Sequence, residues 1–167
     1  ENNTIDLGVV EAPVANKNLV VDVCSSDKLV AIVPLGHAEA GRKSLTYEDL
    51  VKYPFICREE GSGTREVINE YLSDADQGVG ALNISMELGS PEAVKGAVEA
   101  GMGISVVSLA TVQKEKKLDT LVVIDLDPPL ERPFSFVHQK QKFRVRVMEE
   151  LLEFAQNYCK EHQNLGL

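Results

Sequence analysis

One short segment contains the residues best suited to binding a small anion. It runs Arg58-Glu59-Glu60-Gly61-Ser62-Gly63-Thr64-Arg65. An apolar, strand-like stretch precedes it and apolar residues at helical spacing follow it, so its glycines lie at a strand-to-helix junction. Backbone N–H groups at a helix start converge on an anion, and two hydroxyl side chains add further hydrogen-bonding groups. The pattern predicts an anion-binding loop; the alternative is that Ser62 or Gly63 only caps its own helix.

Two further residues are candidates because each follows a predicted strand. Glu11 comes directly after apolar residues 5–10, at the strand end where open α/β sheets bind ligands; a solvated loop carboxylate is the alternative. Ser90 precedes Pro91 and is expected to cap a helix, and capping alone is enough to explain a serine there. Known nucleotide-binding motifs do not fit, because the Walker Gly-Lys-Ser/Thr and the third Rossmann glycine are both missing.

The sequence lacks the arrangement of residues that an enzyme needs. A nucleophile requires a neighbouring base and a group that orients the base. The three histidines, His37, His138 and His162, stand alone without a metal-binding spacing, and Cys57 lies in an apolar stretch typical of a core residue. We therefore expect a binding module with no catalytic residue, no metal site and no cofactor.

The composition of the chain limits the kinds of molecule that it can bind and the compartment in which it is expected. The 167 residues are 44% hydrophobic, which is enough for a buried core, and the net charge of −9 opposes direct binding to nucleic acid. The three cysteines form no CxxC pair, which favours a reducing compartment. No apolar run is long enough to cross a membrane. The expected location is the cytoplasm, with no membrane partner.

Apolar stretches rich in β-branched residues alternate with stretches of helical period, the pattern of an α/β fold with a largely parallel sheet. Strands are predicted at residues 5–10, 19–23, 29–33, 55–57, 82–88, 104–107, 121–124 and 134–137. Helices are predicted to begin at Thr46, near Arg65 and after Ser90. The last helix is predicted over about 143–160, because apolar residues recur there at three- and four-residue steps: Phe143, Val147, Leu151, Phe154, Ala155 and Tyr158. The charged run 114–117 is expected to be a solvated face.

Several of these segments occur in an order that is specific, although each is weak alone. They are Ile5 through Glu11, Leu29 through His37, Leu45 through Ile56, Arg58 through Glu66, Gly89 through Val94, Ala100 through Ser105, Arg132-Pro133-Phe134 and the closing amphipathic helix. In this order they resemble the C-terminal effector-binding domain of LysR-type transcriptional regulators. The resemblance covers nearly the whole chain.

The resemblance implies an α/β, two-lobed fold like that of periplasmic binding proteins, with mixed, mostly parallel sheets and crossover strands between the lobes. Residues 28–127 would form one complete lobe. Residues 1–27 and 128–167 would form the rest of the other lobe, with the crossover strands and the C-terminal helix. The opening β-α-β-α part of that second lobe and the winged helix-turn-helix of the family are expected to be absent.

The resemblance also implies a function. A small-molecule effector, expected to be a small anion, would bind between the lobes at Ser62, Gly63 and Thr64, flanked by Arg65, with Glu11 near the hinge and Ser90 at a second helix start. Effector binding would change the geometry of the lobes and of a homodimer, and DNA would be contacted only through the missing N-terminal domain. A transport solute-binding protein and, less favoured, a small phosphate-ester enzyme are the alternatives.

Overall fold

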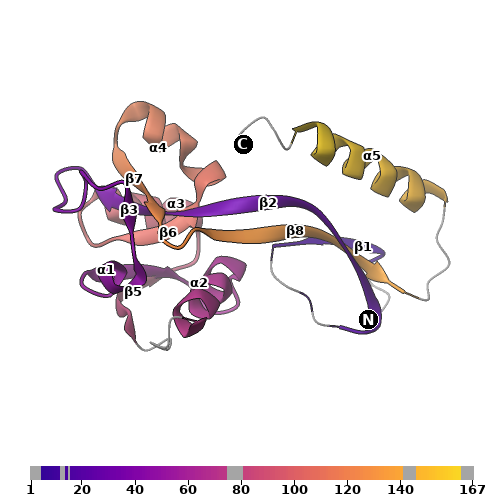
Figure 1. Ribbon diagram of the computed structural model, residues 1–167, viewed down its shortest axis with the longest axis horizontal. Coiled ribbons are helices and arrows are strands. Elements are labelled where there is room, and N and C mark those ends of the chain that lie inside the picture. The colour runs from indigo at the N-terminus through magenta and orange to yellow at the C-terminus, as the bar shows by residue number, and fades with distance from the viewer. Residues whose placement is uncertain (1–4, 12–13, 15, 75–80, 141–145, 163–167) are drawn as a thin grey trace. The chain divides into compact units, whose positions relative to one another are not determined.

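The computed structural model describes residues 5–11, 14, 16–74, 81–140 and 146–162. The chain forms two compact units: unit 1 comprises Glu1–Asp27 and Arg132–Leu167, and unit 2 comprises Lys28–Glu131. Two strands, β2 (Leu19–Pro34) and β8 (Leu130–Gln139), contain the residues at which the chain passes from one unit to the other (Figure 1). Each unit has its own core.

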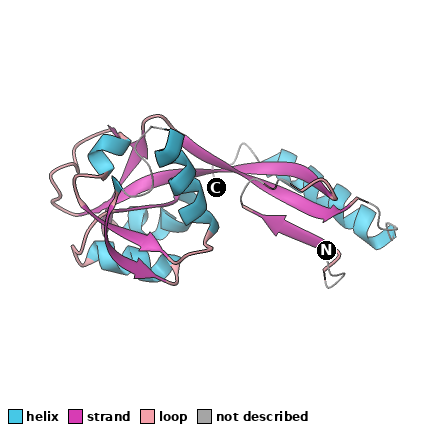
Figure 2. Cartoon of the chain, turned by 90° about the horizontal axis from the view of Figure 1, so that it is seen from below, coloured by secondary structure: helices cyan, strands magenta, loops and turns pink. Residues whose placement is uncertain are grey.

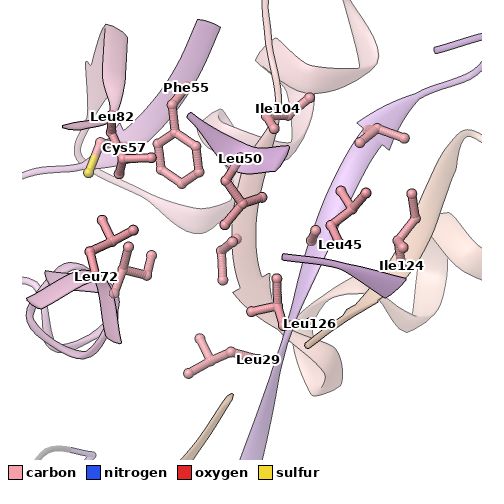
Figure 3. Close-up of a cluster of buried hydrophobic side chains, with 14 of the residues drawn as sticks. Leu29, Leu45, Leu50, Phe55, Cys57, Leu72, Leu82, Ile104, Ile124 and Leu126 are labelled. Atoms are coloured by element: carbon pink, nitrogen blue, oxygen red, sulfur yellow. The ribbon is translucent and has the colours of Figure 1, made fainter. Parts of the chain in front are cut away.

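The core of unit 2 is built on the apolar half of β2. Residues 29–33 are all fully buried, because β2 pairs antiparallel with both β6 (Ser105–Ser108) and β7 (Leu121–Leu126). A short strand, β3 (Ser44–Leu45), pairs parallel with β7. Figure 3 shows side chains from these strands meeting those of α1 (Tyr47–Leu50), β4 (Pro54–Arg58) and α2 (Gly63–Asp74), including Leu45, Leu50, Phe55 and Leu72.

A second, two-stranded sheet in unit 2 pairs β4 with β5 (Asn83–Leu88) in parallel. The helix α3 (Pro91–Glu99) follows β5, and its apolar side chains Val94 and Val98 pack with Ile56 of β4. The turn after α3 approaches β4 closely: a Cβ at Gly103 would lie 2.4 Å from the carbonyl oxygen of Pro54. Only glycine fits this contact, which lets Ile104 pair with Phe55.

Unit 1 consists of a three-stranded part of the main sheet and one helix. β1 (Leu7–Val10) pairs antiparallel with β8, and β8 is flanked on its other side by β2. The helix α5 (Arg146–His162) lies behind these strands in the view of Figure 2. Its residues Met148, Leu152, Ala155 and Cys159 pack on the sheet. The predicted helix is present, but its predicted apolar face is wrong apart from Ala155, because the other described residues of that pattern are exposed: Val147, Leu151, Phe154 and Tyr158.

Most predicted elements are present, with differences that have physical causes. The two strands predicted at 19–23 and 29–33 are one continuous strand, because the polar residues between them are accommodated in extended backbone and Asp27 is paired with Arg132. The sheets are mixed, as predicted, but they are not mostly parallel. β2 pairs antiparallel with β6 and β7, and β1 pairs antiparallel with β8; in the described residues the parallel pairs are β3–β7, β4–β5 and the bridge at Phe55. Phe143, the predicted first apolar residue of the last helix, lies outside the described residues.

The charged run 114–117 is not simply a solvated face, contrary to the sequence interpretation. It lies mostly in α4 (Gln113–Leu118), and Glu115 is buried, with its carboxylate 2.9 Å from the ammonium group of Lys95 in α3. The lysine also donates to the carbonyl oxygen of Thr111 at 2.7 Å. Lys95 is 20 residues away from Glu115 in the chain. The local pattern of charges around Glu115 therefore cannot indicate this ion pair.

None of the described helices is both long enough and apolar enough to cross a bilayer.

The start of α1 is held by a buried carboxylate. Asp49 accepts a hydrogen bond from the backbone N–H of Thr46 at 3.1 Å and lies 2.8 Å from both Lys52 and Arg42. Interaction with Lys52 first, and with Arg42 and the Thr46 N–H in addition, holds the pKa of Asp49 well below its usual range. A carboxyl group with a lowered folded-state pKa contributes stability above its unfolded pKa and loses it as the pH falls.

We predict that Asp49→Asn lowers the free energy of unfolding by about 2 kcal/mol at pH 7, because hydrogen bonds to a charged group are lost. The deficit relative to the wild type should shrink as the pH falls from about 5 to about 3, since the wild-type carboxylate then loses its advantage. Urea denaturation at both pH values measures it. The matched control is Asp125→Asn, which removes an exposed pair with Lys28 and should cost little at either pH. A constant deficit for Asp49→Asn would contradict the prediction.

Candidate functional site

The carboxyl ends of β4 and β5 meet at one edge of their sheet. The two strands run parallel, with Arg58 opposite Leu88, and the backbone N–H of Glu59 donates to the carbonyl oxygen of Leu88 at 3.3 Å. The helix α2 begins a few residues after β4, and α3 begins three residues after β5. Both helix N-termini therefore start from the same edge.

The predicted glycine loop forms the start of α2. Gly61 has a φ of 82°, in the left-handed region that favours glycine, and the N–H of Ser62 then donates to the carbonyl of Glu59 at 3.2 Å. The N–H of Glu66 donates to the carbonyl of Ser62 at 3.0 Å, so Ser62 is the residue just before the helix and is largely buried. The helix begins at Gly63, two residues earlier than the apolar pattern indicated.

This start has the electrostatics of an anion site. The first N–H groups of any helix precede its i→i−4 ladder and carry the positive end of the helix dipole, and α2 begins at Gly63. The hydroxyl group of Ser90 accepts from the N–H of Ala93 at 3.1 Å, so Ser90 does cap α3 as the sequence indicated. Its hydroxyl proton is not used in that bond.

The side chain of Arg65 is engaged by the protein itself. Its guanidinium donates to the carbonyl of Arg58 at 3.0 Å, pairs with Glu87 of β5 and lies 3.9 Å from Glu60. Glu87 raises the pKa of Arg65 further above its usual value. These contacts fasten the first turn of α2 to both strands of the sheet.

The second arginine of the loop is likewise engaged. Arg58 donates to both carboxylate oxygens of Glu59, at 2.6 and 2.8 Å, and the pair lowers the pKa of Glu59 to about 2. Both guanidinium groups of the loop are therefore matched by carboxylates. Attraction for a further anion must rest on backbone N–H groups and hydroxyls.

Glu11 lies in the other unit and has a different environment. Its carboxylate is 2.8 Å from Nη1 of Arg132, while Nη2 and Nε of the same guanidinium contact Asp27 at 2.8 and 2.9 Å. Arg132 and Asp27 are each about 5% exposed and Glu11 about half exposed. The structure thus brings Ser62, Gly63, Thr64, Arg65 and Ser90 to one sheet edge in unit 2 and leaves Glu11 in unit 1.

Asp27 is not indicated by the sequence alone. The available signal was an acidic residue two positions before the apolar run 29–33, combined with Arg132 far along the chain. Neither residue is informative alone, because an exposed Asp and an exposed Arg are ordinary surface residues.

No catalytic constellation is visible in the described part of the chain. Cys57 is buried in the core of unit 2, as predicted, and burial raises the pKa of its thiol. His37 accepts from the N–H of Glu39 at 3.3 Å and packs edge-on against Tyr53, while His138 is buried. The residues described contain no group of three or more metal-ligating side chains. The arrangement at the β4–β5 edge is one that can bind a ligand.

Comparison with known proteins points to one family. The family model for the LysR substrate binding domain matches residues 1–160. The RuBisCO operon transcriptional regulator of Allochromatium vinosum is 33% identical over 96% of this chain and 54% of its own length. The HTH-type transcriptional activator CmpR of Synechocystis sp. is 33% identical over 92% of this chain and 50% of its own length. The chain therefore spans about half the length of these relatives, which are transcription regulators.

Solved structures give the same fold. The regulatory domain of CcmR from Synechocystis PCC6803, in complex with 2-PG, superposes with a TM-score of 0.84 at 30% identity, covering 95% of this chain and 76% of that one. The effector binding domain of QuiR, in complex with shikimate, gives a TM-score of 0.82 at 21% identity, covering 96% and 75%. The α/β fold class predicted from the sequence is confirmed.

We predict that Arg132→Leu destabilises the chain by about 3 kcal/mol, because it leaves the buried carboxylate of Asp27 without the cation that it contacts. The matched control is Arg146→Leu, which removes an arginine from an exposed pair with Glu150 and should cost less than about 0.5 kcal/mol. Urea denaturation monitored by circular dichroism gives both values. Equal, small effects would show that the buried pair contributes no more than a surface pair.

Proposed function

Because the chain belongs to the LysR substrate binding domain family, we propose that it is the small-molecule effector-sensing domain of a transcription regulator. The observation that carries the proposal is the meeting of two helix N-termini at the carboxyl edge of the β4–β5 sheet. This edge supplies the backbone donors of Gly63, Thr64 and Arg65, with hydroxyl groups from Ser62, Thr64 and Ser90.

The effector that suits this edge is a small anion. Several N–H groups and the dipoles of α2 and α3 favour negative charge, and the hydroxyls accept or donate as the ligand requires. The regulatory domain of CcmR, 30% identical to this chain, was solved with 2-PG, which makes that compound a rational first probe. Arg65 acts here through its backbone N–H, while its side chain holds the loop in place.

The two units correspond to the two lobes in this proposal. Residues 28–127 form the complete effector lobe, and residues 1–27 and 128–167 contribute to the other lobe, the crossover strands and the C-terminal helix. Asp27 and Arg132 pair at the positions where β2 and β8 pass from one unit to the other. Effector binding then shifts the population of the domain toward one geometry of the lobes. Glu11, which contacts Arg132, is assigned to effector binding near the hinge.

The partners follow from the family. The relatives are named as HTH-type or operon regulators and are about twice as long as this chain, so DNA contact is assigned to a helix-turn-helix outside it. The net charge of −9 supports this assignment, because it opposes direct contact of this chain with DNA. The proposal further assigns the domain to a homodimer in the cytoplasm. A transport solute-binding protein and a phosphate-ester enzyme are disfavoured, because the matched relatives regulate transcription.

We predict that Thr64→Val weakens binding of the effector anion about tenfold or more, because one hydrogen bond to a charged ligand is lost. Titration calorimetry with 2-PG, inorganic phosphate and inorganic sulfate measures it. The matched control is Thr120→Val, whose hydroxyl donates to Glu99 away from the loop and which should bind as the wild type does.

Two results would count against the proposal. Unchanged affinity in Thr64→Val would remove that residue from the site. Failure of the wild-type chain to bind any of the three anions would remove the anion class as the effector of this domain.

A further inference from the structure

Two cysteines that are distant in sequence meet in unit 1. Cys24 lies in β2 on the face that packs against α5, and Cys159 is the last residue of the apolar stripe by which α5 packs on the sheet. Cys24 is buried in the cluster of Phe136, Met148 and Leu152, and Cys159 packs against the same cluster. Burial first, and Cys159 in addition, raises the pKa of Cys24. All three cysteines of the chain are in the thiol form, and the third, Cys57, belongs to the core of unit 2.

We propose that a hydroperoxide oxidises Cys24 and Cys159 to a reversible intramolecular disulfide, and that this bond links α5 covalently to β2. The proposal is independent of the effector site, because both cysteines lie in unit 1 and the helix-start residues lie in unit 2.

The placement satisfies what a disulfide needs. Two cysteines are bridged without backbone movement only when their Cα atoms are within about 7 Å and their side chains point toward each other. Both side chains enter one apolar cluster, Cys24 from β2 and Cys159 from α5, and Cys159 is close enough to raise the pKa of Cys24. The helix and the strand that carry them also share the packed side chains of Phe136, Met148 and Leu152, so their relative position within the unit is fixed by a core.

The two thiols have different roles in the reaction. Cys24 is 9% exposed, and burial together with its contact to Cys159 raises its pKa to about 11, so it rests as a thiol. Cys159 is only partly buried and is the one that a small oxidant reaches. A partly accessible thiol next to a second thiol is the arrangement in which a resolving cysteine captures the first oxidation product.

The steps balance. The thiolate of Cys159 attacks the O–O bond of the hydroperoxide ROOH and forms a sulfenic acid, and the alkoxide that leaves takes up the proton of the thiol to give ROH. The sulfur of Cys24 then attacks the sulfenic sulfur. The S–S bond forms, and the S–OH oxygen leaves as water with the proton of Cys24. The two sulfurs are oxidised by two electrons in total, and the peroxide is reduced by two.

The bond would constrain the chain strongly. It closes a loop of about 135 residues, and the loss of unfolded-state entropy grows with loop length. For a chain of this size the melting temperature should rise by about 5–10 °C. Because β2 continues into unit 2, the constraint acts on a strand that both units share.

The test treats the full chain with a modest excess of hydrogen peroxide under native conditions, then alkylates remaining thiols and maps peptides by mass spectrometry. We expect a peptide pair joined through Cys24 and Cys159, a monomer on a non-reducing gel, and a raised melting temperature that dithiothreitol reverses. The matched control Cys57→Ala should give the same cross-link. Cys24→Ser and Cys159→Ser should each abolish it and the thermal shift.

Three results would overturn the proposal. The first is oxidation of Cys159 to sulfinic acid with Cys24 still reduced. The second is a cross-link between two chains instead of within one. The third is formation of the same bond as fast in denaturing urea as in buffer, which would show that the folded unit does not bring the thiols together.

Discussion

The parallel pairing of β4 with β5 is the constraint on which the candidate site depends. The carboxyl ends of parallel strands lie at the same edge of the sheet. The helices α2 and α3, which follow β4 and β5, therefore both begin at that edge. That pairing is held on one side by Ile104 bridging to Phe55, which requires the close approach of Gly103 to Pro54. On the other side, Arg65 ties the first turn of α2 to Glu87 of β5. A glycine and an ion pair thus fix where two sets of backbone donors point.

The acidic character of the chain explains why the arginines and the buried lysine that the structure describes are paired with carboxylates. Arg58, Arg65, Arg132 and Lys95 each contact one or more carboxylates. Buried charges are tolerated only when they are matched in this way, and with 26 acidic against 17 basic residues the cations are the scarcer partner. Three of these cations join two elements: Arg65 joins α2 to β5, Arg132 joins β8 to β2, and Lys95 joins α3 to α4. Carboxylates of this acidic chain therefore contribute to the stability of its fold.

The sequence predicted features whose cause is local and missed those whose cause is a distant partner. Ser90 before Pro91 is a helix start whatever surrounds it, and it caps α3 as expected. The helix α5 is also present as predicted, but it packs through Met148 and Leu152, whereas the predicted Leu151 and Phe154 are exposed. The continuity of β2 through Asp27, the burial of Glu115 and the contact of Cys24 with Cys159 depend on residues 105, 20 and about 135 positions away. No local pattern encodes such partners, so only three-dimensional packing reveals them.

An acidic chain can still attract an anion, provided that the attraction is local. The net charge acts over a Debye length of about 8 Å or more and is weakened by salt, whereas N–H groups at a helix start act at hydrogen-bond distance. Glu59 and Glu87 each contact one guanidinium group of the loop, and Glu60 adds an exposed carboxylate, so attraction for an anion must come from the N–H groups at the start of α2. These N–H groups are fixed in direction, whereas long cationic side chains adapt. In the proposed function, the directions of the N–H groups are therefore what distinguishes one small anion from another.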